Sequence, residues 1–282
     1  MNLSQKKPRS QLICPREHTV SKLAAILDDM GIVHVRGTPA SGKTCLSELL
    51  RDYYRKEGRK VFLIMEWEKL DPKNPWGSFI KLVEKWNEEL ESSPITSFTS
   101  TSSKSKHDPS WVVTSNTVIL VDEAQKTYSD AVLWDTILKA RQATTCDYNF
   151  RLCLFCSYGS PNIGPDKTFF TPVKLPNKWC ISLTPQNLRG SPSIGLFYDK
   201  EEFKDAVSRL LTFQYPERFS FDEDAQDYIF ALSNGHPGAV SSILNALFQV
   251  CAKYLFNFFF FLTLFEPPHI GACWEALSEP KS

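Results

Sequence analysis

The chain has 282 residues, of which 42% are hydrophobic and 13% are aromatic. This composition supports a sizeable buried core and excludes a disordered or collagen-like chain. The 32 Lys and Arg residues balance the 32 Asp and Glu residues, so binding to nucleic acid through a generally basic surface is not indicated. A net charge near zero favours self-association. The length predicts one large domain, or a core with a small satellite.

The amino-terminal sequence lacks the apolar segment of a signal peptide, so we expect a cytoplasmic protein. Eight cysteines are scattered along the chain, and several lie in apolar runs, which is typical of reduced, buried thiols. Cys153 and Cys156 form a CxxC pair that invites a metal or redox interpretation. They lie in an expected strand, however, where positions three apart point to opposite faces. We therefore expect no metal or redox centre there.

Helices and strands are predicted to alternate after a leader over residues 1–18. Apolar residues at helical spacing predict a first helix over 19–30, with Thr19 as its cap and Gly31 as its end. Further helices are predicted at 45–57, 76–91 and 129–141, and apolar runs predict strands at 32–35, 60–66, 117–121, 150–156 and 179–183. This order indicates a parallel sheet covered on both faces, within a core over residues 19–190.

Three segments differ from this core. Residues 92–110 contain 11 Ser or Thr among 19 residues, which predicts a mobile insertion. Helices at 200–212, 222–233 and 239–250 predict a helical lid over 191–250. The tail 251–282 is rich in Phe, but its apolar run of 12 residues is shorter than a membrane span requires, so we expect no transmembrane segment. We interpret the tail as buried or non-native rather than as an anchor.

Residues 37–44 fit the pattern GxxxxGK[ST] between an apolar strand and an amphipathic helix. Glycines permit backbone angles and close approach that a Cβ would block, so main-chain amides can face phosphates. Lys43 supplies a catalytic positive charge to the terminal phosphates, and Thr44 supplies a hydroxyl for Mg²⁺. The predicted nucleotide-binding residues of this loop are Gly37, Thr38, Pro39, Ala40, Ser41, Gly42, Lys43, Thr44 and Cys45.

A second motif follows the strand at 117–121. Asp122 falls at the carboxyl end of that strand, where open parallel sheets bind ligands, and is predicted to hold Mg²⁺ together with the loop hydroxyl. Glu123 is predicted to be the base that activates the attacking water. The next strand has a polar exit, where Ser157, or alternatively Ser160, is predicted to sense the terminal phosphate. The sequence lacks a complete guanine-reading motif, which favours ATP over GTP.

These features together resemble the AAA+ and STAND classes of P-loop ATPases. The expected fold is therefore a three-layer α/β P-loop nucleoside triphosphatase with a five-stranded parallel sheet, followed by a small helical lid. Residues 15–17 are similar to the Gly-Arg-Glu signature of STAND proteins, although Pro15 replaces the glycine. Residues 235–240 resemble a lid motif whose proline lies against adenine. The resemblance implies that Arg16 lies near the nucleotide and that Pro237 packs on the base.

A closer resemblance is to the ATPase domain of Crinkler-type effector proteins of fungi and oomycetes. It rests on the stretches HVRGTPASGKT, VILVDEAQ, FCSYGSP, GLFYDKEEF and LSNGHPGAV, which together span about residues 12–250. The resemblance implies an ATPase that longer relatives couple to a translocation header or a nuclease-like domain, neither of which we expect here. It also implies delivery to a host cell or nucleus.

The motifs predict hydrolysis of ATP to ADP and phosphate with Mg²⁺. Two alternatives stay open: a nucleotide-dependent switch or scaffold without turnover, and a P-loop kinase for a small molecule. No arginine finger is assigned, and Arg141 and Arg189 are the candidates for it. Such a residue contributes on the order of 10³–10⁵ in rate in related systems, so its absence predicts slow hydrolysis.

Overall fold

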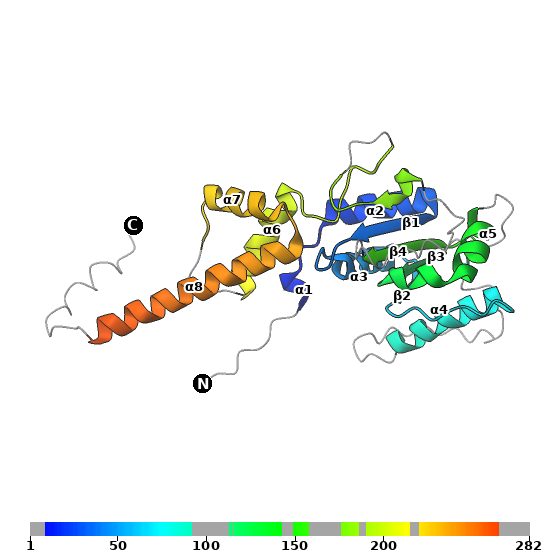
Figure 1. Cartoon of the computed structure of the whole chain (residues 1–282), viewed down its shortest axis with the longest axis horizontal. Coiled ribbons are helices and arrows are strands. Elements are labelled where there is room, and N and C mark those ends of the chain that lie inside the picture. The colour runs from blue at the N-terminus through cyan, green and yellow to red at the C-terminus, as the bar shows by residue number, and fades with distance from the viewer. Residues whose placement is uncertain are drawn as a thin grey trace.

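A five-stranded parallel sheet with the strand order β2-β3-β4-β1-β5 forms the centre of the molecule. The computed structural model describes residues 9–91, 113–114, 116–142, 149–157, 176–185, 190–214 and 220–264. Helices cover the sheet, and a helical unit follows at one end of it (Figure 1). The predicted three-layer α/β fold with five parallel strands and a helical lid is confirmed. The strands are β1 (Ile32–Gly37), β2 (Lys60–Ile64), β3 (Thr117–Val121), β4 (Arg151–Ser157) and β5 (Cys180–Ile181).

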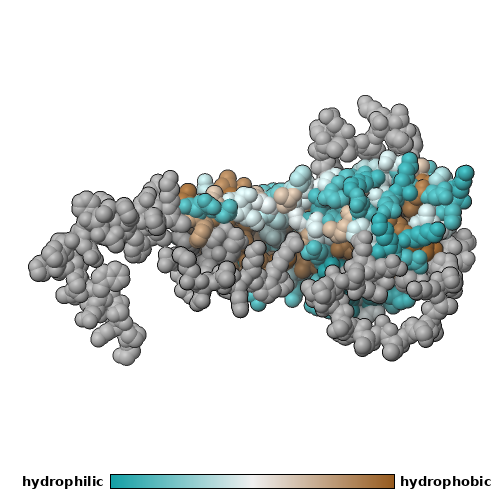
Figure 2. All heavy atoms as spheres, turned by 90° about the horizontal axis from the view of Figure 1, so that it is seen from below, coloured by the Kyte–Doolittle hydropathy of each residue, from teal (hydrophilic) through white to brown (hydrophobic). Residues whose placement is uncertain are grey.

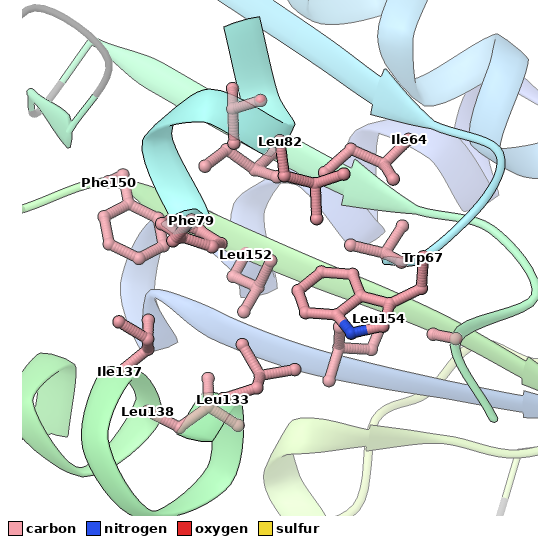
Figure 3. Close-up of a cluster of buried hydrophobic side chains, with 14 of the residues drawn as sticks. Ile64, Trp67, Phe79, Leu82, Leu133, Ile137, Leu138, Phe150, Leu152 and Leu154 are labelled. Carbon is pink, nitrogen blue, oxygen red and sulfur yellow. The ribbon is translucent and has the colours of Figure 1, made fainter. Parts of the chain in front are cut away.

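Both faces of the sheet are buried, which explains why the strands are continuous apolar runs. On one face, Val33 and Val35 pack in a cluster with residues of the helices α2 and α3. On the other face, Ile32 belongs to a cluster with residues of α4 and the π-helix η3. Figure 3 shows this second cluster, in which aromatic and branched side chains from β4, α4 and η3 point toward one another. The helices and turns of the core are α2 (Glu17–Met30), α3 (Lys43–Lys56), α4 (Pro75–Glu91), η2 (Ala124–Ser129), η3 (Val132–Leu138), α5 (Lys139–Gln142) and η4 (Asn177–Trp179).

The CxxC pair is divided between the two faces of β4. Cys153 belongs to the cluster under α2 and α3, whereas Cys156 belongs to the cluster under α4 and η3. The predicted opposite orientation is therefore confirmed. Within the described residues, no group of three or more His, Cys, Asp or Glu side chains is arranged to hold a metal ion.

Several predicted boundaries were wrong. Thr19 does not cap the first helix, because α2 begins at Glu17 after Arg16, and Arg16 has a left-handed backbone with φ 49°. The Thr19 hydroxyl instead donates to Oε1 of Glu202, 183 residues away. The fifth strand is reduced to Cys180–Ile181, and the segment predicted as one helix over 129–141 is divided between η2, η3 and α5.

The helical unit has a small core of its own, formed by Phe203, Val207, Ile229, Val240 and Leu244. Its helices are α6 (Lys200–Arg209), the π-helix η5 (Leu210–Gln214), α7 (Glu223–Ser233) and α8 (Pro237–Leu264). Asp199 and Asp222 cap α6 and α7, each accepting a hydrogen bond from a backbone amide three residues ahead. The short helix α1 (Arg9–Leu12) lies against α6 and η5.

Helix α8 is much longer than the predicted segment at 239–250. It includes the first part of the Phe-rich tail and extends away from the sheet (Figure 1). Among the described residues, no helix has the length and apolar character needed to cross a membrane. The insertion 92–110 and the remainder of the tail lie outside the described residues.

Hydrophobic side chains are exposed on the outer faces of the lid helices. Tyr228 and Leu232 of α7 and Val250 of α8 are each more than half exposed. In Figure 2, hydrophobic surface is visible at the lid end, whereas hydrophilic surface predominates over the end that contains the sheet.

Candidate functional site

The loop between β1 and α3 has the backbone that its glycines require. Gly42 precedes α3 in the left-handed region, with φ 86°. A Cβ on Gly37 would lie only 2.3 Å from Leu196 Cδ1 and 2.4 Å from Ser41 Oγ. Ala40 also adopts a positive φ of 58°, which a non-glycine residue does at a cost. The strand, loop and helix therefore follow the arrangement expected of a phosphate-binding loop.

The carbonyl of Thr38 organises the polar groups of this loop. It accepts hydrogen bonds from Ser41 Oγ at 2.7 Å and from Lys43 Nζ at 2.8 Å. Lys43 also donates to the carbonyl of Gly37 at 3.3 Å. Burial lowers the pKa of Lys43, while the nearby carboxylates of Glu123 and Asp122 act in the opposite direction. The ammonium group is thus held against the loop, close to two acidic side chains.

Asp122 lies directly after β3 and is buried. Its Oδ2 accepts a hydrogen bond from Thr44 Oγ1 at 2.7 Å, and its Oδ1 accepts one from the amide of Glu123 at 3.0 Å. A hydroxyl and a carboxylate are the hard oxygen ligands that Mg²⁺ accepts, with water and phosphate oxygens completing its shell. The two residues that the sequence predicted as Mg²⁺ ligands are therefore in direct contact, and their chemistry fits that ion.

Strand β4 lies between the two motifs. It pairs with β1 and β3, so that Ser157 at its end is in register with Gly37. Consequently Ser157 and Glu123 line the same cleft as the loop. The alternative residue Ser160 lies outside the described residues.

A cleft of about 500 Å³ lies between the phosphate loop and the helical lid. The lid contributes Tyr198 and Leu210 to its wall, and the leader contributes Leu12 and Ile13. Of the residues predicted from the sequence, the cleft is lined by Arg16, Pro39, Ala40, Ser41, Gly42, Lys43, Thr44, Cys45, Glu123, Ser157 and Pro237. Gly37, Thr38 and Asp122 are linked to it through the hydrogen bonds given above.

The lid touches the phosphate loop directly. The amide of Gly238 donates to the carbonyl of Ala40 at 3.0 Å. Nε2 of His236 lies 3.3 Å from Thr38 Oγ1, and its Nδ1 accepts a hydrogen bond from the amide of Ala239. Pro237 is the first residue of α8, a position that suits its fixed φ and missing N–H. These contacts place the start of α8 against the loop.

The guanidinium of Arg16 forms hydrogen bonds and an ion pair with other groups of the protein. Its guanidinium donates to the carbonyls of Gly195, Leu196 and Phe197 and forms a buried ion pair of 2.9 Å with Glu202. The guanidinium also lies over the ring of Tyr198, 5.2 Å from its centroid. Arg16 therefore joins the leader to the segment that precedes α6 while lining the cleft.

Of the two candidates for an arginine finger, Arg141 does not line the cleft. Arg141 donates to the carbonyl of Phe150 at 2.7 Å and to Oδ1 of Asn149 at 3.0 Å. It also lies against Gly31, just before β1, whereas the phosphate loop follows that strand. Arg141 therefore lies at the amino-terminal end of β1, whereas the cleft lies at the carboxyl end of that strand. Arg189 lies outside the described residues.

Sequence reasoning missed three residues that support this site. Gln125 connects Glu123 to the end of β4, His236 contacts the loop, and Glu202 pairs with Arg16. All three lie inside stretches singled out from the sequence, so their positions were visible, although their contacts were not.

Comparison with known proteins gives fold-level likenesses only. No family model matches the chain, and no curated protein sequence matches it. Among solved structures, the chain is similar to the Walker-type ATPase PABY2304 of Pyrococcus abyssi, with 15% identity, a TM-score of 0.44, and coverage of 93% of this chain and 79% of that one. It is similar to the ORC2 protein of Aeropyrum pernix in its ADP form, with 14% identity, a TM-score of 0.44, and coverage of 88% and 67%. It is also similar to AMPPCP-bound DnaA from Aquifex aeolicus, with 11% identity, a TM-score of 0.40, and coverage of 80% and 59%.

Proposed function

We propose that the chain is an ATPase module that binds ATP with Mg²⁺ and hydrolyses it to ADP and phosphate. The observation that carries this proposal is the convergence, in one cleft, of the phosphate loop, the Thr44–Asp122 pair and the Glu123 carboxylate. The loop amides and Lys43 bind the phosphates, and Pro237 lies on the wall where the base is proposed to pack. Arg16 shapes the same wall through its contacts with the segment before α6.

Each polar residue has a distinct role in the proposed reaction. Thr44 and Asp122 would hold Mg²⁺, which would neutralise negative charge on the phosphates when bound. Glu123 orients a water molecule and accepts its proton as the oxygen attacks the terminal phosphorus. The bond from that phosphorus to the bridging oxygen breaks, and ADP leaves. Lys43 offsets the charge that develops on the transferred group, and Ser157 contacts its oxygens.

A nucleotide-dependent switch with little turnover is the second candidate. Among the described residues that line the cleft, Arg16 is the only arginine, and its guanidinium is already bonded to protein groups. A module of this kind needs a cation from a partner subunit or another protein for fast hydrolysis. The resemblance of five sequence stretches to Crinkler-type effectors is the basis on which we propose an effector or signalling role for the module, including action in a host cell or nucleus.

Two variants test the proposal. Calorimetric titration of the full chain with ATP and Mg²⁺ should show binding for the wild type and for Glu123→Gln, and at least ten-fold weaker binding for Lys43→Ala. Release of phosphate should occur in the wild type and be absent in Glu123→Gln. Lys22→Ala, on the exposed surface of α2, serves as the matched control for Lys43→Ala. Equal affinity of the wild type and Lys43→Ala would refute the proposal, whereas binding without turnover in the wild type would favour the switch.

A further inference from the structure

The Glu123 carboxylate and the end of β4 are connected by one side chain. The Gln125 side chain reaches back from η2, donating through Nε2 to Oε2 of Glu123 and accepting through Oε1 from the amide of Ser157 at 2.9 Å. Its two polar groups therefore contact two residues that line the cleft. Gln125 itself is half-buried and does not line the cleft, so its contacts act on the site from behind.

The orientation of this amide is fixed by its neighbours. A backbone N–H can only donate, so the atom that meets the Ser157 amide is the oxygen of Gln125. The NH₂ group must then face Glu123, and a carboxylate accepts such a donor. Reversing the amide would place a donor against a donor and an oxygen against an anionic oxygen. The side chain thus has one favourable arrangement between these two partners.

The two carboxylate oxygens of Glu123 differ in their hydrogen bonding. Oε2 is occupied by Gln125, whereas Oε1 has no protein hydrogen-bond partner among the described residues. Glu123 also has a left-handed backbone with φ 48°, so the chain turns sharply between β3 and η2. The carboxylate lies near the Lys43 ammonium, on the side where the phosphates are proposed to bind. One oxygen is anchored, and the other is left for a water molecule.

We propose that Gln125 is the positioning residue for Glu123, because it anchors one carboxylate oxygen to the end of β4 and leaves the other to hold the attacking water. This inference rests on the proposed ATP hydrolysis. Gln125 does not line the cleft in which the nucleotide is proposed to bind. It acts through Glu123, and its connection to Ser157 couples the base to the strand end that contacts the terminal phosphate.

Two substitutions of nearly equal length separate this role from a purely structural one. Gln125→Glu retains an oxygen for the Ser157 amide but replaces the donor that faces Glu123 by a second carboxylate oxygen. Gln125→Met has a similar length and neither polar group. If Gln125 only fastened η2 to β4, Gln125→Glu would keep that contact and the wild-type rate. If it positions Glu123, both variants lose turnover. The neighbouring exposed residue gives the control, Lys126→Ala.

The experiment measures kcat and KM for ATP hydrolysis, ATP affinity by titration, and thermal unfolding, all with the full chain. We expect Gln125→Glu and Gln125→Met to lower kcat by about 10- to 100-fold, because misplacing a catalytic base has effects of this order. KM and ATP affinity should stay within two-fold of the wild type.

The inference would be overturned if either Gln125→Glu or Gln125→Met had the wild-type kcat, a raised kcat, or a raised KM with kcat unchanged. If Gln125→Met fails to fold, Gln125→Glu alone decides, and if Gln125→Glu fails to fold, Gln125→Met does. A wild-type chain that binds ATP without turnover would contradict the proposed hydrolysis itself, and this outcome is recorded before any variant is compared.

Discussion

The contact between the lid and the phosphate loop leaves no room for a side chain at Gly238. A Cβ added there would lie 2.6 Å from the Cβ of Ala40 and 2.9 Å from its carbonyl oxygen, where contact closer than 3.0 Å forces a shift. Because these atoms belong to the backbone or are directly attached to it, the lid and the loop must separate by roughly 1 Å. Gly238→Ala is therefore expected to weaken the docking of the lid on the loop.

The magnitude follows from two opposing effects. Overpacking of this kind costs about 1–3 kcal/mol, and the hydrogen bond from the Gly238 amide to Ala40 is weakened as well. Replacing glycine by alanine inside a helix stabilises the helix by about 1 kcal/mol, which offsets part of this cost. The net cost of about 1–2 kcal/mol corresponds to a roughly ten-fold loss of ATP affinity if the docked lid is the binding state. The midpoint of thermal unfolding should also fall by a few degrees.

The assay is ATP titration together with thermal unfolding, on Gly238→Ala, Ala40→Gly and the double variant. Ala40→Gly removes one of the clashing atoms and relieves the positive φ of Ala40, so the double variant should recover part of the lost affinity. Ser242→Ala, at an exposed position of α8, is the control. A Gly238→Ala variant with wild-type affinity and an unchanged unfolding midpoint would refute the reasoning, because the lid would then not press on the loop.

Three further predictions concern the core and the proposed Mg²⁺ site. Glu202→Gln leaves a buried guanidinium without its counter-charge, so denaturant unfolding should show a loss of about 3–5 kcal/mol, whereas Glu201→Gln, at an exposed position, should change stability by less than about 0.5 kcal/mol. Asp122→Asn keeps an acceptor for Thr44 but removes the negative charge, so ATP titrations should lose most of their dependence on Mg²⁺; an unchanged dependence would remove this residue from the proposed site. Burial lowers the pKa of His34 to about 3 from an ordinary value near 6.5. The unfolded chain therefore binds a proton that the folded chain excludes, so stability should fall as the pH drops from about 6.5 toward 3, and His34→Phe should flatten this slope in unfolding curves recorded at several pH values.

Local sequence patterns were enough to predict the sheet and the loop. A buried parallel strand is a continuous apolar run, and a phosphate loop is a short pattern of glycines with Lys43 and a hydroxyl, so neither needs knowledge of distant residues. The proximity of Thr44 and Asp122 was also expected, because both follow the carboxyl ends of strands in one parallel sheet, although their direct hydrogen bond was not predicted.

Contacts between distant segments could not be predicted in this way. Thr19 is a residue type that often caps helices, but its hydroxyl donates a hydrogen bond to Glu202, which is distant in the sequence. Arg16 matched a signature for a nucleotide contact, yet its donors are taken by carbonyls at 195–197. Gln125 lies two residues from Glu123, and only the pairing of β4 with β3 brings Ser157 to its other end. In each case tertiary pairing decides which partner a polar side chain meets.

Helix α8 connects the cleft to a distant part of the molecule. Its first residue, Pro237, lies beside Gly42, and the helix continues without a break to Leu264, a span of about 40 Å at 1.5 Å per residue. If the helix rotates as a rigid body about its first residue, the displacement of its far end grows in proportion to its length. A tilt of roughly 5° at the loop therefore carries the opposite tip through about 3–4 Å, a displacement comparable to the distance between neighbouring Cα atoms.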